Sequence, residues 1–133
     1  MVKRSCIAIT LIALATTAAF SQEPESTLAP SISPAELHVQ RESGEAPVVI
    51  DVRTSEEFAT GHIPGAVNIP FDQIAERISE IETPHGVALY CMVGPRARKG
   101  EAALLAEGHE KVLHIEGGLA AWQAAGLPVT GDP

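Results

Sequence analysis

The chain has few cysteines, few aromatic residues and few basic residues, and these shortages narrow the range of functions that it can have. Its 133 residues include two cysteines, and aromatic residues account for 4% of the chain. The chain has nine basic residues and 17 acidic residues, which gives a formal net charge of −8. Such a surface repels nucleic acid and anionic membranes, so we expect no nucleic-acid partner. The length leaves room for one domain with one site.

Residues 1–21 are typical of a secretory signal peptide. Lys3 and Arg4 form a basic start, residues 6–20 are apolar or threonine, and small residues precede a predicted cut after Ser21. The apolar run is shorter than the roughly 18 to 20 residues of a spanning helix. We therefore expect cleavage and a periplasmic or secreted protein. The alternative is a retained N-terminal anchor, the one case in which we expect membrane contact.

Cleavage would leave a single thiol in the mature chain. Cys6 lies within the signal segment, so Cys91 is the cysteine that remains, and it has no partner for an internal disulfide. Exported domains tend either to pair their cysteines or to lack them. A lone thiol in such a protein therefore indicates a reactive group.

After the signal segment, the sequence predicts a flexible linker at 22–31, one domain at 32–129 and a short tail at 130–133. The linker is rich in Pro, Ser and Glu and shows no hydrophobic period. The domain alternates strand and helix patterns, with aliphatic strands expected at 48–53, 66–69, 87–90 and 112–115. Helices are expected at 34–42, 55–60, 72–81, 96–107 and 119–125. This alternation predicts an α/β fold with a mainly parallel sheet, helices on both faces and a site at the carboxyl ends of the strands.

Cys91 falls at that predicted site. It ends the strand VALY, and the loop CMVGPR then leads into a helix that opens near Arg96. Loop N–H groups and the helix dipole favour a thiolate there. We expect Gly94 to permit the tight curl through a positive φ. Arg96, Arg98 and Lys99 bring three cations to this region of an acidic chain, which favours a small anionic substrate; the alternative for Arg98 and Lys99 is that they point into water.

The segments DVRTSEEFATGHIPGAVNIP, CMVGPR and GGLAAWQAAGLPV resemble, in order and spacing, the signature segments of single-domain rhodaneses, the thiosulfate sulfurtransferase family. The resemblance implies a rhodanese-like fold and a sulfurtransferase in which Cys91 carries sulfur as a persulfide. It implies a small anionic donor such as thiosulfate, and a thiol or cyanide-like acceptor that includes protein thiols, with no cofactor. The anion cradle would be formed by Met92, Val93, Gly94, Pro95 and Arg96.

Three positions depart from the pattern of many rhodaneses. Met92, Val93 and Ala97 stand where that family often has a basic or polar residue, a Ser or Thr, and a Ser. The cradle is therefore more apolar than usual. This departure leaves the donor open, because it either weakens thiosulfate binding or favours a larger, partly apolar acceptor.

Four polar residues near the first expected strand resemble parts of a catalytic triad. Attack on sulfur requires only a thiolate, so a general base is not needed. We therefore expect structural roles: an ion pair between Arg53 and Glu57, and hydrogen bonds from Asp51 and His62 that fix the loops. These side chains would support the site from behind the residues that touch the substrate.

The remaining histidines and the single tryptophan point to no further site. His38, His85, His109 and His114 lack the spacing of metal ligands, so no metal site is expected. Trp122 lies at helical spacing from Leu119 and is expected in the core.

Two other functions remain open at this stage. A cysteine phosphatase or arsenate reductase needs five residues between its cysteine and arginine, and Ala97 occupies that arginine position here. A non-catalytic binding module of the same fold would usually have lost the cysteine or the loop glycine, whereas Cys91 and Gly94 are both present. The sequence thus favours sulfur transfer over both alternatives.

Overall fold

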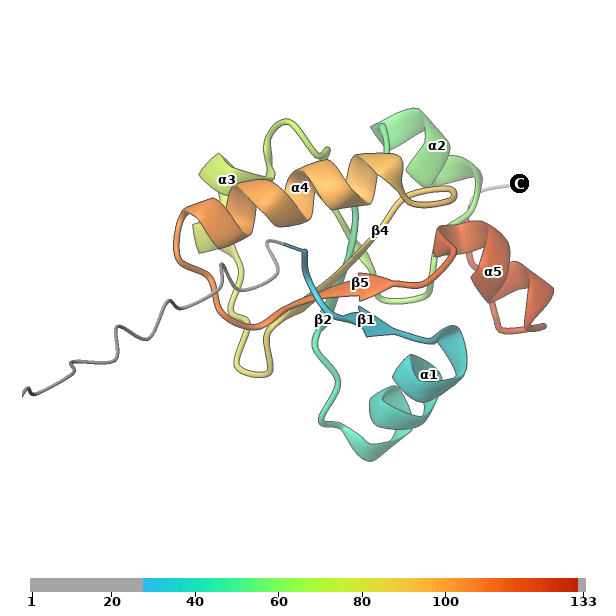
Figure 1. Cartoon of the computed structure of the whole chain (residues 1–133). Coiled ribbons are helices and arrows are strands. Elements are labelled where there is room, and N and C mark those ends of the chain that lie inside the picture. The colour runs from blue at the N-terminus through green and yellow to red at the C-terminus, as the bar shows by residue number, and fades with distance from the viewer. Residues whose placement is uncertain (1–27, 132–133) are drawn as a thin grey trace, which may run out of the picture.

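The computed structural model describes residues 28–131, and its centre is one sheet of five strands (Figure 1). The strands are β1 (Ser31–Ile32), β2 (Val48–Asp51), β3 (Val67–Asn68), β4 (Val87–Tyr90) and β5 (Val112–Ile115). They lie in the order β1-β5-β4-β2-β3, and every neighbouring pair is parallel. The predicted α/β fold with a mainly parallel sheet is confirmed. The predicted signal peptide and most of the predicted linker lie outside the described residues.

Helices cover both faces of this sheet, as predicted. On one face lie α4 (Pro95–Ala106) and α3 (Ile74–Arg77), which continues into a 3-10 turn at Ile78–Glu80 (Figure 1). On the other face lie α1 (Pro34–Ser43) and α5 (Gly118–Ala124), and the short α2 (Ser55–Thr60) lies near the carboxyl ends of the strands. Within residues 28–131, no helix has the length and apolar character needed to span a bilayer.

Side chains of each strand alternate between two hydrophobic clusters, one on each face of the sheet. In β4, Leu89 joins the cluster under α3 and α4, whereas Ala88 and Tyr90 join the cluster under α1 and α5. Trp122 is fully buried in the second cluster, as the sequence predicts. Because both faces are covered, the strands read as continuous aliphatic runs in the sequence.

The first two helices begin after capping residues, Ser33 and Thr54. The Ser33 hydroxyl accepts from the backbone N–H of Glu36, whose carboxylate accepts from the backbone N–H of Ser33. Thr54 and Glu57 form the same reciprocal pair at the start of α2. These capping boxes satisfy N–H groups that have no partner inside the helix, so they define where each helix starts.

The domain extends slightly beyond the predicted bounds of 32–129. His114 donates its backbone N–H to the carbonyl of Pro30, and Ser31 pairs with His114 in β1. At the other end, the backbones of His62 and Thr130 exchange two hydrogen bonds of 2.7 and 2.9 Å. These pairings involve one or two residues, which is too short for a hydrophobic period to appear in the sequence. The predicted linker and tail therefore each give residues to the fold.

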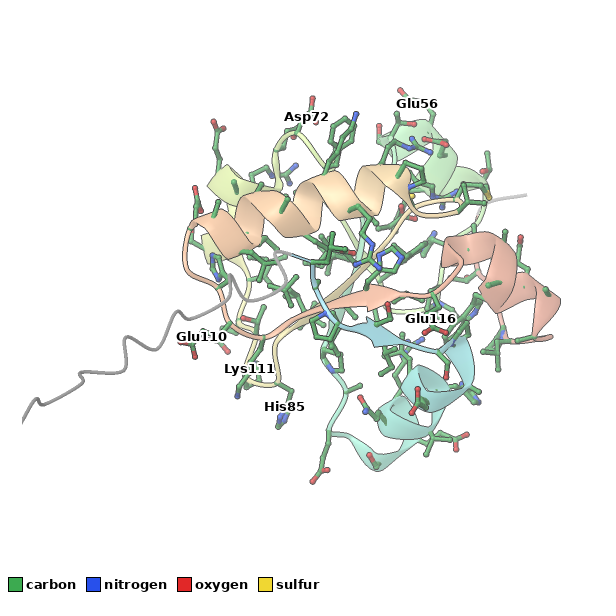
Figure 2. The ribbon with its side chains drawn as sticks, in the orientation of Figure 1. Glu56, Asp72, His85, Glu110, Lys111 and Glu116 are labelled. Carbon is green, nitrogen blue, oxygen red and sulfur yellow. The ribbon has the colours of Figure 1, made fainter. Side chains whose placement is uncertain are left out.

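The two ends of the sheet carry different kinds of residue. At the amino end, His85 precedes β4 and Lys111 precedes β5, and both side chains project from the molecule (Figure 2). At the carboxyl end, the chain leaves β2 and β4 through Asp51 and Cys91. The reactive candidates from the sequence therefore gather at one end.

Candidate active site

Cys91 lies directly after β4, the central strand of the sheet. Cys91 is 1% exposed and packs in the hydrophobic cluster under α4. It is the free cysteine of the described residues. The carboxyl end of a central parallel strand is where open α/β sheets bind their ligands. The fold thus places a thiol at the position that this architecture uses for chemistry.

The loop after Cys91 presents unpaired backbone N–H groups. Among the described residues, none accepts a hydrogen bond from the N–H of Met92, Val93 or Gly94. Pro95 is the first residue of α4 and has no N–H of its own. The side chains of Met92 and Val93 are 40% and 59% exposed. Free N–H groups that precede a helix form an anion-binding concavity, here with an apolar rim.

The first turn of α5 holds this loop from the other side. Leu119 donates its N–H to the carbonyl of Cys91 at 2.9 Å, and Ala120 donates to the carbonyl of Met92 at 3.0 Å. The backbones approach so closely that a Cβ on Gly118 would lie 2.4 Å from the Cys91 carbonyl oxygen. Because two successive loop carbonyls are bound to α5, the orientation of the peptide units around the thiol is fixed.

Gly94 does not have the role that the sequence predicts for it. Its φ is 163°, which is extended backbone rather than the left-handed region. A Cβ at this position would meet the ring of His114 at an ordinary contact distance of 3.7 Å. The left-handed residues of this site are Gly117 and Gly118, with φ of 68° and 60°. The glycines that shape the loop are thus those of the segment that supports it.

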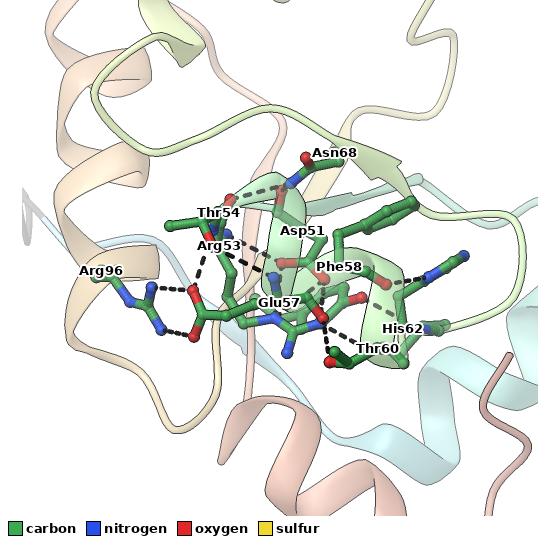
Figure 3. A network of polar contacts seen from close by, with 12 residues as sticks. Asp51, Arg53, Thr54, Glu57, Phe58, Thr60, His62, Asn68 and Arg96 are labelled. Atoms are coloured by element: carbon green, nitrogen blue, oxygen red, sulfur yellow. Dashed lines mark hydrogen bonds and ion pairs between the residues drawn. The ribbon is translucent and has the colours of Figure 1, made fainter. Parts of the chain in front are cut away.

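Arg96 and Glu57 form a two-pronged ion pair at the start of α4 (Figure 3). The Arg96 Nη1 and Nη2 donate to the two carboxylate oxygens of Glu57 at 2.7 and 2.9 Å. These bonds lower the pKa of Glu57 to about 2. They also raise the pKa of Arg96, with a smaller electrostatic contribution from Cys91. The guanidinium therefore lies within the field of the thiol but already holds one carboxylate.

This pair corrects the predicted ion pair between Arg53 and Glu57. Arg53 instead folds back on Asp51, with Nη2 2.6 Å from Oδ2 and Nε 3.0 Å from Oδ1. Both side chains are buried. Burial lowers the pKa of Arg53, but the Asp51 carboxylate outweighs burial and the net direction is upward. Glu57 faces α4 because its carboxylate also caps α2 through Thr54.

The other candidates near β2 hold the segment around α2. Arg53 donates from Nη2 to the carbonyl of Gly61 at 2.7 Å. His62 places Nδ1 2.7 Å from the carbonyl of Phe58, and its ring stacks on the Phe58 ring at a centroid distance of 3.6 Å. Figure 3 shows these contacts together with Asp51. The structure therefore gives these side chains contacts within the scaffold.

Arg98 and Lys99 lie on α4, but their side chains contact other segments. Arg98 Nη1 donates to the carbonyl of Ala29 at 2.9 Å and to Glu101 at 3.2 Å. The Lys99 ammonium stands 5.6 Å from the centroid of the Phe71 ring. Arg96 lies in the first turn of the same helix, and the charge of Cys91 contributes to its raised pKa.

A buried polar pair behind the loop was missed by the sequence reasoning. His114 of β5 places Nδ1 2.6 Å from Oε1 of Glu101 on α4. Burial raises the pKa of Glu101, whereas His114 and Arg98 act in the opposite direction. Two signals were available: a histidine inside the aliphatic strand VLHI, and a glutamate at helical spacing between the buried Ala97 and Leu104. Neither signal identifies its partner 13 residues away.

The site as a whole combines a buried thiol, free loop N–H groups and a charge-neutral ion pair. Among residues 28–131, no group of three or more His, Cys, Asp or Glu side chains is arranged to hold a metal ion. Cys91 supplies the thiol at this end of the sheet. The arrangement can therefore stabilise a thiolate and bind a small anion against it.

Comparisons with known proteins agree with this geometry. A profile of the Rhodanese-like domain family matches residues 33–125. A sulfurtransferase of Allochromatium vinosum is 39% identical over 82 residues, covering 62% of this chain and 77% of that protein. The solution structure of the rhodanese-like domain of an Anabaena protein superposes with a TM-score of 0.70 at 31% identity, covering 78% of this chain and 80% of the other.

Another relative is much longer than the region it shares. The HTH-type transcriptional regulator Rv0324 of Mycobacterium tuberculosis is 37% identical over 100 residues, which cover 74% of this chain and 44% of the regulator. The chain thus spans less than half of that relative, so the similarity concerns the shared domain.

Proposed function

Because the chain belongs to the rhodanese-like domain family, we propose that it is a sulfurtransferase in which Cys91 carries a sulfur atom as a persulfide. The observation that carries this proposal is the position of Cys91 after the central strand, beside a loop whose N–H groups are unpaired among the described residues. Those N–H groups favour the thiolate before reaction and the negatively charged persulfide after it. The name of the Allochromatium relative is consistent with this activity.

The first half-reaction forms the persulfide. The Cys91 thiolate attacks the outer sulfur of an anionic donor such as thiosulfate, and a new sulfur–sulfur bond forms on Cys91. The sulfur–sulfur bond of the donor breaks, and sulfite leaves with its electron pair. No proton transfer and no outside oxidant are required. A site without a general base at the thiol is therefore sufficient for this step.

The second half-reaction returns the enzyme to its starting state. A thiolate or cyanide attacks the outer sulfur of the persulfide and takes it, and the Cys91 thiolate departs with the bonding electrons. The donor has already left, so the two substrates need not be bound together. The exposed side chains of Met92 and Val93 form the rim that the acceptor meets. This rim favours an acceptor with an apolar part, such as a thiol carried by a protein.

The ion pair of Arg96 with Glu57 limits how the donor is held. Both prongs of the guanidinium are engaged by a carboxylate, so the pair as a whole brings no net charge to the loop. The loop N–H groups therefore provide most of the anion binding. Arg96 contributes only the part of its positive charge that Glu57 does not compensate. A cradle with an apolar rim and one neutralised cation should bind donors less tightly than one with a free cation.

Mass spectrometry of the purified chain after thiosulfate treatment tests the proposal. We predict that wild type gains the mass of one sulfur atom, and that reduction with dithiothreitol removes it. Cys91→Ser should gain nothing, because oxygen does not form a persulfide, while its fold is kept because the side chains are close in size. A binding module without sulfurtransferase activity would leave the wild-type mass unchanged, and that result would contradict the proposal.

A further inference from the structure

The imidazole of His114 lies directly behind the loop that follows Cys91. His114 is 6% exposed, and its side chain leaves β5 on the face covered by α4. On that face, Oε1 of Glu101 stands 2.6 Å from Nδ1. Glu101 is itself 1% exposed. A buried histidine with a buried carboxylate partner has a fixed ring orientation.

Arg98 completes the support of this pair. Its Nη1 donates to the second carboxylate oxygen of Glu101 at 3.2 Å and to the carbonyl of Ala29 at 2.9 Å. Each oxygen of the carboxylate therefore has its own partner. The chain around β1, the helix α4 and the strand β5 are thus tied to one another through a single buried carboxylate.

The opposite edge of the ring faces the loop. A Cβ built on Gly94 would lie 3.7 Å from both Cε1 and Nε2 of His114. Because Nδ1 is engaged with a carboxylate, Nδ1 carries a proton in the neutral ring and Nε2 is the atom that gains the second one. Protonation therefore adds a charge at the edge that faces Gly94. Nothing in the proposed chemistry of Cys91 uses this ring directly.

We propose that His114, oriented by Glu101, is a positioning residue whose charge state makes anion binding in the loop after Cys91 depend on pH. The inference rests on the proposed function of this loop as an anion cradle. An imidazolium behind Gly94 favours an anion on the far side of the loop, and a neutral ring does not. A negatively charged donor would then react faster when the ring carries this charge than when the ring is neutral.

Other charged groups around the ring are held in ion pairs. On α4, Glu101 and Arg98 form one network and Arg96 is paired with Glu57. The neighbouring strand β1 contributes the uncharged Ser31. Among the described residues, two further groups that ionise follow the neighbouring strands: the Cys91 thiol, which follows β4, and the exposed Glu116, which follows β5. The measurement must therefore cancel the ionisation of the thiol itself.

Competing alkylation of Cys91 provides such a measurement. Iodoacetate is an anion and iodoacetamide is neutral, yet both react with the same thiolate, so the ratio of their rates is independent of the fraction of thiolate. We expect this ratio in wild type to fall about threefold between pH 5.5 and pH 8.5, the size expected for one partly screened charge near the thiol. The readout does not involve sulfur transfer, so it separates this inference from the proposed function.

Three variants test whether His114 causes the change of this ratio with pH. His114→Asn keeps a group that bonds to Glu101 but does not titrate, so its ratio should be low and independent of pH. Glu101→Gln keeps the hydrogen bond and removes the charge that favours imidazolium, so the fall should move to lower pH. His85→Asn is the matched control, since His85 is exposed at the opposite end of the sheet (Figure 2) and its ratio should follow wild type.

Several results would overturn the inference. A wild-type ratio that stays flat with pH, or one that keeps its fall in His114→Asn, would assign no electrostatic role to the ring. Failure of wild-type Cys91 to react with either reagent would also contradict it, because no anion would then reach the loop. If His114→Asn does not fold, Glu101→Gln serves as the test instead. A ratio that depends on pH in Glu101→Gln as it does in wild type would contradict the inference. If Cys91 forms a persulfide but the ratio of alkylation rates does not depend on pH, the proposed function is supported and this inference is not.

Discussion

Among single residues, Arg96 is the side chain whose role depends most on its neighbour. Its guanidinium lies within the field of Cys91, but both of its Nη atoms are bound to Glu57. A cation paired in this way attracts a donor anion less than a free one does. The carboxylate of Glu57 therefore acts against the donor, and removing it should have the opposite effect from removing Arg96.

We predict that Glu57→Gln raises kcat/KM for thiosulfate by about threefold, because Arg96 loses the charge that compensates it. Arg96→Ala should lower the same constant by roughly tenfold, since it leaves the Glu57 carboxylate without its cation near the donor. Separate rates of persulfide formation and of transfer to a neutral thiol, at fixed ionic strength, measure both effects.

The control for these kinetics is Glu56→Gln, which removes one charge from the same turn at a side chain that bonds Ser55 rather than Arg96. It should change the donor rate little. The acceptor rates should also change less than the donor rates, because no donor anion is present in that step. Donor kinetics within about twofold of wild type in Arg96→Ala would instead assign anion binding to the loop N–H groups alone.

The same ion pair should make stability depend on acid. The pKa of Glu57 is lowered from 4.5 to about 2, chiefly by its hydrogen bonds to Arg96. A lowered pKa stabilises the folded state above the unfolded value, and this stabilisation disappears as the pH falls from about 4.5 towards 2. The side chains are about one-third exposed, so solvent screening limits the effect to about 0.5 to 1 kcal/mol.

We therefore predict that wild type exceeds Glu57→Gln in free energy of unfolding by that amount at pH 6, and that the difference closes near pH 2. Urea denaturation of the two proteins at a series of pH values measures it. A difference that persists unchanged at pH 2 would mean that the stabilisation does not come from the ionised carboxylate.

At the scale of elements, the close approach of α5 to the loop after Cys91 makes one glycine indispensable. Gly118→Ala would place a Cβ 2.4 Å from the Cys91 carbonyl oxygen in a residue with φ of 60°. We predict a loss of stability of about 3 kcal/mol and a loss of persulfide formation, because the backbone must move away from the thiol. Urea denaturation and the mass shift after thiosulfate treatment measure the two losses.

Gly126→Ala separates the two causes of that loss. Gly126 also has a left-handed φ, of 72°, but no heavy atom lies within 4 Å of the Cβ that it would gain. Its substitution should cost about 1 kcal/mol, the cost of the conformation alone, and should leave persulfide formation intact. Equal losses in the two variants would show that the contact with the loop has no special importance.

The elements themselves were largely predictable from the sequence. Val87–Tyr90 and Val112–Ile115 have the predicted bounds, because strands that are buried on both faces leave uninterrupted aliphatic runs. The helices α1 and α2 also start at the predicted residues, 34 and 55. The strand Ser31–Ile32 was missed because two residues show no period, and its place in the sheet depends on a partner more than 80 positions away.

The site was predictable only where local sequence determines it. Cys91 and its loop follow from a strand, a short turn and a helix that are consecutive in the chain. The partners of Arg53 and Arg96 were not predictable, because several carboxylates lie within reach along the sequence and the fold alone selects among them. The pair of His114 with Glu101 joins two elements across the core, so no spacing rule links them.

For the whole molecule, the main prediction concerns the N-terminus. We predict that the chain isolated from the extracytoplasmic fraction begins near Gln22, because residues 1–21 combine a basic start, an apolar run and small residues ending at Ser21. Removal takes away Lys3 and Arg4 and no acidic residue, which leaves seven basic against 17 acidic residues and a net charge of −10. N-terminal sequencing decides it, and an intact Met1 would contradict it.

The order of the strands has a consequence for when the protein can fold during its synthesis. Among residues 28–131, the first strand, β1, has as its neighbour in the sheet the last strand, β5. While the polypeptide is being synthesised, Ser31 and Ile32 leave the ribosome long before His114 and Ile115, which are their partners. The sheet therefore remains incomplete at one edge until β5 has emerged. The domain acquires its native structure only once this strand is available, as a single unit.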